Sequence, residues 1–200
     1  MSGSDARALA RSLLDLCRMR KLTIATAESC TGGLVAGALT DIPGSSDVID
    51  RGFITYSNEA KRAMLGVNAT TLATFGAVSK ETATQMAVGA LERASVDLAV
   101  SITGIAGPGG ATPGKPVGLV HLAVAARDGR ILHREHRFGA IGRSAVRERS
   151  VVEALRMLME VARGPQALTK PRREAVSRLR PRVARTSRHH AVKRRRPPRV

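Results

Sequence analysis

Apolar and polar positions follow one another along residues 4–162 in patterns that predict a series of helices and strands. Apolar residues recur at helical spacing over 4–20, and the continuous apolar run at 22–25 predicts a buried strand. A second apolar run, 34–39, predicts a buried helix. The remaining predicted strands are 48–56, 97–103, 117–126 and 131–138, and the remaining predicted helices are a short one around Lys61, one at 79–94 and one at 142–162.

The order of these elements predicts an α/β fold. Strands and helices alternate in the first part of the chain, which favours parallel pairing. Between the last two strands, Asp128-Gly129 is a hairpin signal, so these two strands are predicted to be antiparallel neighbours. We therefore expect a three-layer α/β/α sandwich with a mixed, mainly parallel sheet, formed by one domain over residues 1–162.

Charge separates residues 163–200 from this domain. The whole chain has a formal net charge of +17, and residues 163–200 hold 14 basic residues and one acidic residue. Residues 163–200 also contain few apolar residues, and burying these cannot offset the entropy that the chain loses on ordering. We therefore predict a disordered basic tail. Two interpretations remain open for it: an electrostatic arm that contacts nucleic acid, or a dispensable extension.

Composition excludes several other classes of protein. There is no apolar run of membrane-spanning length and no basic-then-apolar leader, so we expect a cytoplasmic protein without a membrane contact. Cys17 and Cys30 are too few for a disulfide framework or a cysteine-based zinc site. His121, His133 and His136 show no metal-ligand spacing, and each is interpreted as a packed or solvated residue.

Residues 26–33 form a corner between the strand at 22–25 and the helix at 34–39. This corner contains a carboxylate, two threonine hydroxyls, a serine, a thiol and two glycines. In open α/β sheets, ligands bind beyond the carboxyl ends of strands, and a helix N-terminus offers N–H groups to an anion. A helix cap followed by a tight glycine turn explains the same residue types without a ligand.

Further hydroxyl groups and one lysine lie near other strand ends. They are Ser45 and Ser46 in a Pro-Gly turn, Tyr56 and Lys61 around the next corner, and Thr103 before a glycine-rich loop. A serine nucleophile needs a base, and a lysine with a lowered pKa serves where no histidine is available. The alternative for Lys61 is a solvated cation on a helix. Only the combination of these residues favours catalysis.

Six longer motifs occur in order along the chain. They are TAESCTGG (26–33), PGSSDV (43–48), RGFITYSNEAK (51–61), GAVS (76–79), SITGIAGPGG (101–110) and KPVGLV (115–120). Together they resemble the CinA family, and more narrowly its C-terminal domain, nicotinamide-nucleotide amidohydrolase. The resemblance covers about residues 5–162 and not the tail. The chain resembles the stand-alone form of the domain.

The resemblance implies hydrolysis of the carboxamide of nicotinamide mononucleotide (NMN) to nicotinate mononucleotide and ammonia, in pyridine nucleotide salvage. It implies no metal and no other cofactor, and a homodimer or larger homo-oligomer. The implied catalytic residues are Ser46 as nucleophile, Lys61 as base and Tyr56 as an assisting group. Ser29 is the main alternative nucleophile. Cys30 is a weaker one, because a neighbouring carboxylate raises a thiol pKa.

The resemblance also implies a set of substrate-binding residues. They are Glu28, Ser29, Thr31, Gly32, Gly33, Ser45, Asn58, Thr103, Gly104, Gly107, Arg143 and Arg147. Arg143 is the expected phosphate ligand, because the guanidinium fork matches phosphate, and Arg147 one turn later is the alternative. A competing hypothesis is a non-catalytic nucleotide or nucleic-acid binder that uses the glycine-rich loops and the basic tail.

Overall fold

The computed structural model describes residues 3–164, so the predicted tail lies, from residue 165 onward, outside the described residues. Its helices and strands are α1 (Gly3–Arg20), β1 (Ile24–Glu28), α2 (Leu34–Thr40), the short 3₁₀ helix η1 (Ser45–Asp47), β2 (Ile49–Ile54), α3 (Asn58–Leu65), α4 (Ala69–Phe75), α5 (Lys80–Ala94), β3 (Leu98–Gly104), β4 (Leu119–Ala126), β5 (Ile131–Arg137) and α6 (Arg143–Arg163).

The five strands form one mixed sheet in the order β2-β1-β3-β4-β5. β1 pairs in parallel with β2 and β3, while β4 pairs antiparallel with β3 and β5. Four strands therefore run in one direction and β4 opposes them. The predicted mixed, mainly parallel sheet is confirmed, and so is the antiparallel pairing of the last two strands.

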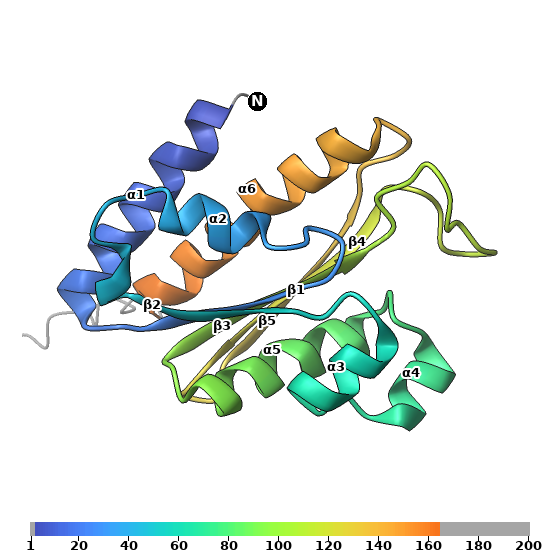
Figure 1. The fold of residues 1–200 in the computed structure, drawn as a ribbon, viewed down its shortest axis with the longest axis horizontal. Coiled ribbons are helices and arrows are strands. Elements are labelled where there is room, and N and C mark those ends of the chain that lie inside the picture. The colour runs from blue at the N-terminus through green and yellow to red at the C-terminus, as the bar shows by residue number, and fades with distance from the viewer. Residues whose placement is uncertain (1–2, 165–200) are drawn as a thin grey trace, which may run out of the picture. The chain divides into compact units, whose positions relative to one another are not determined.

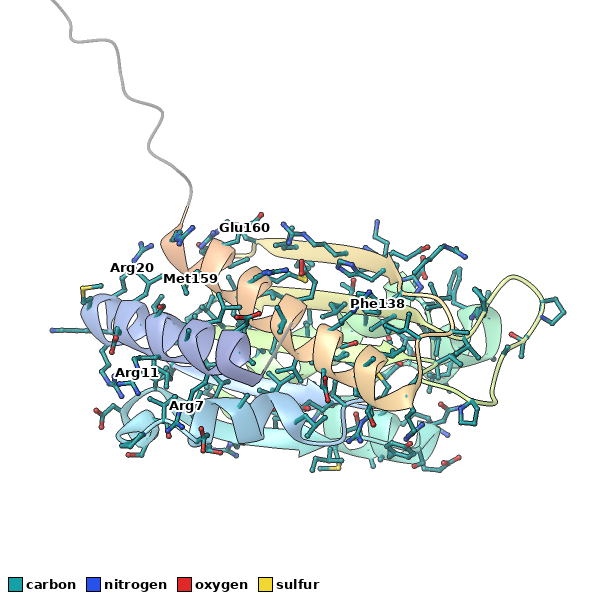
Figure 2. The ribbon with its side chains drawn as sticks, turned by 90° about the horizontal axis from the view of Figure 1, so that it is seen from above. Arg7, Arg11, Arg20, Phe138, Met159 and Glu160 are labelled. Atoms are coloured by element: carbon teal, nitrogen blue, oxygen red, sulfur yellow. The ribbon has the colours of Figure 1, made fainter. Side chains whose placement is uncertain are left out.

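Helices cover both faces of this sheet. Figure 1 shows α1, α2 and α6 over one face and α3, α4 and α5 over the other. In Figure 2, which looks onto the first of these faces, α1 and α6 lie side by side across the strands. The predicted three-layer α/β/α sandwich is therefore confirmed. No helix of residues 3–164 is long and apolar enough to cross a membrane.

The two faces are packed differently. On the α1/α6 face the core is built from large side chains such as Leu14, Ile102 and Leu155. On the α5 face it is built largely from small ones, including Ala25 and Ala27 of β1. Small side chains let α5 lie close to the sheet and to α3, and a Cβ at Gly89 of α5 would lie 1.9 Å from the backbone oxygen of Leu65. This contact fixes the end of α3.

Two elements differ from the sequence-based prediction. β1 begins at Ile24 and ends at Glu28, so the corner after it is shorter than predicted and Glu28 belongs to the strand. α4 was not predicted, because its sequence ATTLATF has no long helical repeat of apolar residues and only Thr71 and Leu72 are buried. A helix this short forms because it packs against α5.

Packing of α6 gives a test of this core. Met157 of α6 is fully buried, whereas Met19 of α1 is 75% exposed. We expect Met157→Ala to lower the free energy of unfolding by about 2–5 kcal/mol through the lost contacts and the cavity. We expect the matched Met19→Ala to change it by less than about 0.5 kcal/mol. Urea denaturation followed by circular dichroism measures both, and equal effects would contradict the packing described here.

Candidate active site

The candidate site lies beyond the aligned carboxyl ends of three parallel strands. Glu28, the last residue of β1, pairs with Ile54 of β2 and Ile102 of β3. The residues that follow these positions, Ser29 and Thr55, therefore come out at the same edge of the sheet. This edge is where ligands bind in open α/β sheets.

Lys61 reaches this edge from α3. The helix begins after Ser57, whose hydroxyl accepts a hydrogen bond from the Ala60 N–H. Although lysines are rarely buried, the Lys61 side chain is only 1% exposed. Its Nζ lies 3.1 Å from Ser29 Oγ and donates to the Thr55 carbonyl at 2.8 Å. A serine hydroxyl and a buried amine are thus within hydrogen-bond distance.

Burial determines the electrostatics of this amine. Removal from water disfavours the ammonium form, and this lowers the pKa of Lys61; a smaller interaction with Cys30 opposes the shift. A neutral amine has a lone pair, and that lone pair can accept the proton of the Ser29 hydroxyl. The pair therefore has the geometry and the electrostatics of a nucleophile and its general base.

The Glu28 carboxylate is directed to α2 and not to Lys61. It is fully buried and accepts hydrogen bonds from the N–H groups of Gly33, Val35 and Ala36 at 2.8–3.0 Å, and from the Thr26 hydroxyl at 3.1 Å. The N–H groups that the sequence offered to a substrate anion are therefore bound by a carboxylate of the same chain. The corner is held by Glu28, and its glycines allow the turn, with Gly33 at φ +97°.

Two arginines of α6 approach the corner in different ways. Arg147 donates from Nε to the Cys30 carbonyl at 3.1 Å and from Nη2 to the Thr31 carbonyl at 2.9 Å. Arg143 is exposed and donates to the Gly107 carbonyl at 3.0 Å and to the Tyr56 hydroxyl at 2.8 Å. Arg147 thus fixes the backbone after Ser29, whereas Arg143 joins the loop after β3 to Tyr56.

The structure does not bring Ser46 to this cluster within one chain. Ser45 and Ser46 belong to η1, which precedes β2, and Ser46 is exposed. Because β2 starts beside the amino end of β1, its six residues separate η1 from the carboxyl end by about 20 Å. Asn58, at the start of α3, is also exposed.

The glycine-rich loop has structural reasons for its residues. Thr103 is buried and its hydroxyl donates to the Ala77 carbonyl at 2.8 Å. A Cβ at Gly104 would lie 2.7 Å from a Val120 methyl group, so this glycine permits close packing on β4. Neither residue presents a free side-chain group to a ligand, and Gly107 contributes its carbonyl to Arg143.

Thr55 is a site residue that the sequence analysis missed. It acts through its backbone carbonyl, which any residue type provides, so no signal in the sequence marks it. The hydroxyls of Thr55 and Thr31 are buried and have no hydrogen-bond partner within residues 3–164. Elsewhere, His121 and His133 lie 3.1 Å apart between ring nitrogens, and the described part of the chain has no cluster of three potential metal ligands.

Similar proteins have been characterised by sequence and structure. The nicotinamide-nucleotide amidohydrolase PncC of Escherichia coli K12 is 47% identical over 160 residues, which cover 80% of this chain and 96% of that protein. The crystal structure of competence/damage inducible protein CihA from Agrobacterium tumefaciens has a TM-score of 0.77 and 58% identity, and covers 78% of this chain and 94% of that one.

Longer proteins are also similar. A CinA-like protein of Mycolicibacterium gilvum is 53% identical over 142 residues, which are 71% of this chain but 33% of that protein. The chain thus spans about a third of the length of several curated relatives that it matches. The family model of the CinA C-terminal domain matches residues 6–162. The chain belongs to the CinA C-terminal domain family.

Proposed function

We propose that this chain hydrolyses the carboxamide of NMN to nicotinate mononucleotide and ammonia, with Ser29 as nucleophile and Lys61 as base. The observation that carries the proposal is the 3.1 Å contact between Ser29 Oγ and the buried Lys61 Nζ. The similarity to the E. coli nicotinamide-nucleotide amidohydrolase supports the choice of substrate. Titratable groups with shifted pKa values cluster at reactive sites, so the buried amine beside a serine favours catalysis over the non-catalytic alternative.

In the first half of the reaction, the neutral Lys61 amine accepts the Ser29 proton while Ser29 Oγ forms a bond to the carboxamide carbon. The tetrahedral intermediate then collapses. Lys61 returns its proton to the amide nitrogen, the carbon–nitrogen bond breaks and ammonia leaves. The product of this step is an ester between Ser29 and the nicotinoyl group.

In the second half, a water molecule takes the place of the ammonia that has left. Lys61 removes a proton from the water as its oxygen adds to the ester carbon, and the second tetrahedral intermediate forms. When the ester bond breaks, Lys61 donates this proton to Ser29 Oγ. The free serine and nicotinate mononucleotide result, and the atoms and protons balance without a further reactant.

The oxyanion of both intermediates needs hydrogen-bond donors. At the corner, the Gly32 N–H donates to the Ser29 carbonyl and the Gly33 N–H to Glu28. We therefore assign the oxyanion to the N–H groups of Cys30 and Thr31, which directly follow the nucleophile. Such donors contribute on the order of 3 kcal/mol each to transition-state stabilisation. Arg147 holds the carbonyls of the same two residues and so keeps the donors in place.

Arg143 and Tyr56 are assigned to substrate binding. The guanidinium of Arg143 lies at the entrance and keeps further N–H groups for a phosphate after its two hydrogen bonds. Tyr56 is 61% exposed and its hydroxyl accepts from Arg143, so we assign its ring to the cationic pyridinium of NMN rather than to proton transfer. Arg147 is committed to the backbone and is not the phosphate ligand in this proposal.

Ammonia release from NMN tests both the reaction and the nucleophile. We expect the protein to release ammonia, Ser29→Ala to lower kcat at least about a thousandfold, and the matched Ser46→Ala to keep at least about a tenth of the activity. Isothermal titration with NMN checks that Ser29→Ala still binds. No ammonia from the unaltered protein would favour the non-catalytic binder, and an active Ser29→Ala would remove the assigned nucleophile.

The pH dependence tests Lys61. Since the base acts only when unprotonated, and burial lowers the pKa of Lys61, we expect kcat/KM to rise with pH through this lowered pKa and to level off below the ordinary lysine range. The measurement is the rate of NMN hydrolysis across neutral and alkaline pH. Lys61→Met, which is neutral and similar in length, should abolish turnover, and a rate that falls as pH rises would contradict the assignment.

Cys30 offers a test of the competing thiol nucleophile. Burial is the main cause that raises the pKa of Cys30 to about 12, so hardly any thiolate exists at neutral pH. We expect iodoacetamide at pH 8 to leave the activity of the folded protein unchanged, and Cys30→Ser to retain turnover. Protein unfolded in urea, in which both cysteines react, is the control. Rapid inactivation, with Cys30 alkylated by iodoacetamide, would contradict this expectation.

A further inference from the structure

Two histidines meet on the face of the sheet that α5 covers. Ala123 of β4 lies opposite His133 of β5, and Ala123 belongs to a buried cluster with residues of α5. His121 is two residues from Ala123 along β4, so it lies on the same face. The ring nitrogens His121 Nδ1 and His133 Nε2 are 3.1 Å apart. Because the two residues come from neighbouring strands, 12 positions apart in the chain, no local sequence pattern shows that they meet.

The two rings direct their nitrogens, and not their faces, at each other. Their centroids are 5.3 Å apart and their planes are 23° from parallel. The rings themselves take up most of the difference between this distance and the 3.1 Å between the nitrogens. Metal–nitrogen bonds of about 2.0–2.1 Å hold two imidazole ligands of one ion roughly 2.9–3.4 Å apart, and the two nitrogens lie within this range.

Both rings are in the form that binds metal ions. Only the neutral imidazole is a ligand, and burial is the main cause that lowers the pKa of His121 and of His133. His121 is 7% exposed and His133 is half-buried. The charged groups that act on the rings are two cations and two carboxylates, so they add no net charge that would repel an ion: Lys80, Lys115, Glu81 and Glu135.

Glu135 lies at the other nitrogen of the His121 ring. It is directly opposite His121 in the pairing of β4 with β5, and its Oε2 is 3.9 Å from His121 Nε2. The carboxylate is partly exposed, so its side chain has room to shorten this distance. In metal sites, a ligating histidine commonly donates its second N–H to a carboxylate, which leaves the first nitrogen free to bind the ion.

We propose that His121 and His133 together bind one divalent transition-metal ion, such as Zn²⁺ or Cu²⁺, through Nδ1 of the first ring and Nε2 of the second. Imidazole nitrogen suits these ions, whereas Mg²⁺ and Ca²⁺ prefer oxygen ligands. Among residues 3–164 no third metal-binding side chain joins the pair, so water fills the remaining positions. The ion enters past His133, which lies on the edge strand β5.

This site is separate from the proposed active site. His121 pairs with Thr103 of β3, and Ser29 follows β1 on the other side of β3. Two strand spacings, or roughly 10 Å, therefore separate the backbones of His121 and Ser29. An ion at the histidines ties β5 to β4 and stabilises the folded state by mass action. Its test measures binding, so the outcome does not depend on the proposed deamidation.

Zinc titration of the full chain tests the proposal. His189 and His190 lie outside the described residues, and both are changed to alanine in every protein compared, so that they contribute no imidazole. Isothermal titration calorimetry of this parent protein should show one Zn²⁺ bound per chain. Loss of an outer-sphere partner alone costs about 10–100-fold in affinity, so His133→Ala should weaken binding at least about tenfold. His133→Gln, which keeps a polar side chain on the strand, should do the same.

His136→Ala is the matched control. His136 is also a histidine of β5, but its Nε2 lies 3.9 Å from Glu153 of α6, on the opposite face of the sheet, so this variant should bind Zn²⁺ as tightly as the parent protein. Electron paramagnetic resonance of the Cu²⁺-loaded parent protein should show two coordinated imidazole nitrogens, and that of His133→Ala only one.

Three results overturn the proposal. They are no Zn²⁺ or Cu²⁺ binding by the parent protein, unchanged binding in both variants of His133, and loss of binding in His136→Ala. Each of them leaves His121 and His133 as a hydrogen-bonded pair of neutral rings without a metal ion.

Discussion

The buried Glu28 carboxylate is the interaction on which the rest of the site depends. A carboxylate removed from water is costly unless hydrogen bonds replace the lost hydration. Here three N–H groups at the start of α2 and the Thr26 hydroxyl provide them. The same bonds hold the chain in the turn that directly follows Ser29. Since Ser29 is the next residue, the hydrogen bonds that satisfy the Glu28 carboxylate also position the serine.

Burial of Lys61 is the second constraint, and the small side chains of the α5 face make it possible. Ala25 and Ala27 of β1 and Gly89 of α5 let helices approach closely, so α3 is held where its lysine reaches the strand ends. Burial lowers the pKa of this amine and costs stability, and in the proposed reaction the amine serves as a base without histidine. The burial that lowers the stability of this layer of the sandwich therefore also provides the proposed base.

The fold is more predictable from the sequence than the site. The sheet and its final hairpin follow from local signals such as Asp128-Gly129, whereas α4 lacks a long apolar repeat and forms through packing. The contact between Ser29 and Lys61 joins residues 32 positions apart, and no spacing rule reveals it. One rule does favour Ser29 over Ser46: ligands bind beyond the carboxyl ends of strands, and Ser29 follows a predicted strand while Ser46 precedes one.

The contact of Arg147 with the Cys30 and Thr31 carbonyls has a consequence for biosynthesis. It ties the last helix to the first strand across 116 positions of the chain. A ribosome delivers the N-terminal part first, so Ser29 and Lys61 emerge well before the arginine that steadies the neighbouring backbone. A nascent or prematurely ended chain that lacks α6 carries Ser29 and Lys61 without this anchor. The backbone after Ser29 therefore acquires its last anchor only when the domain is nearly complete.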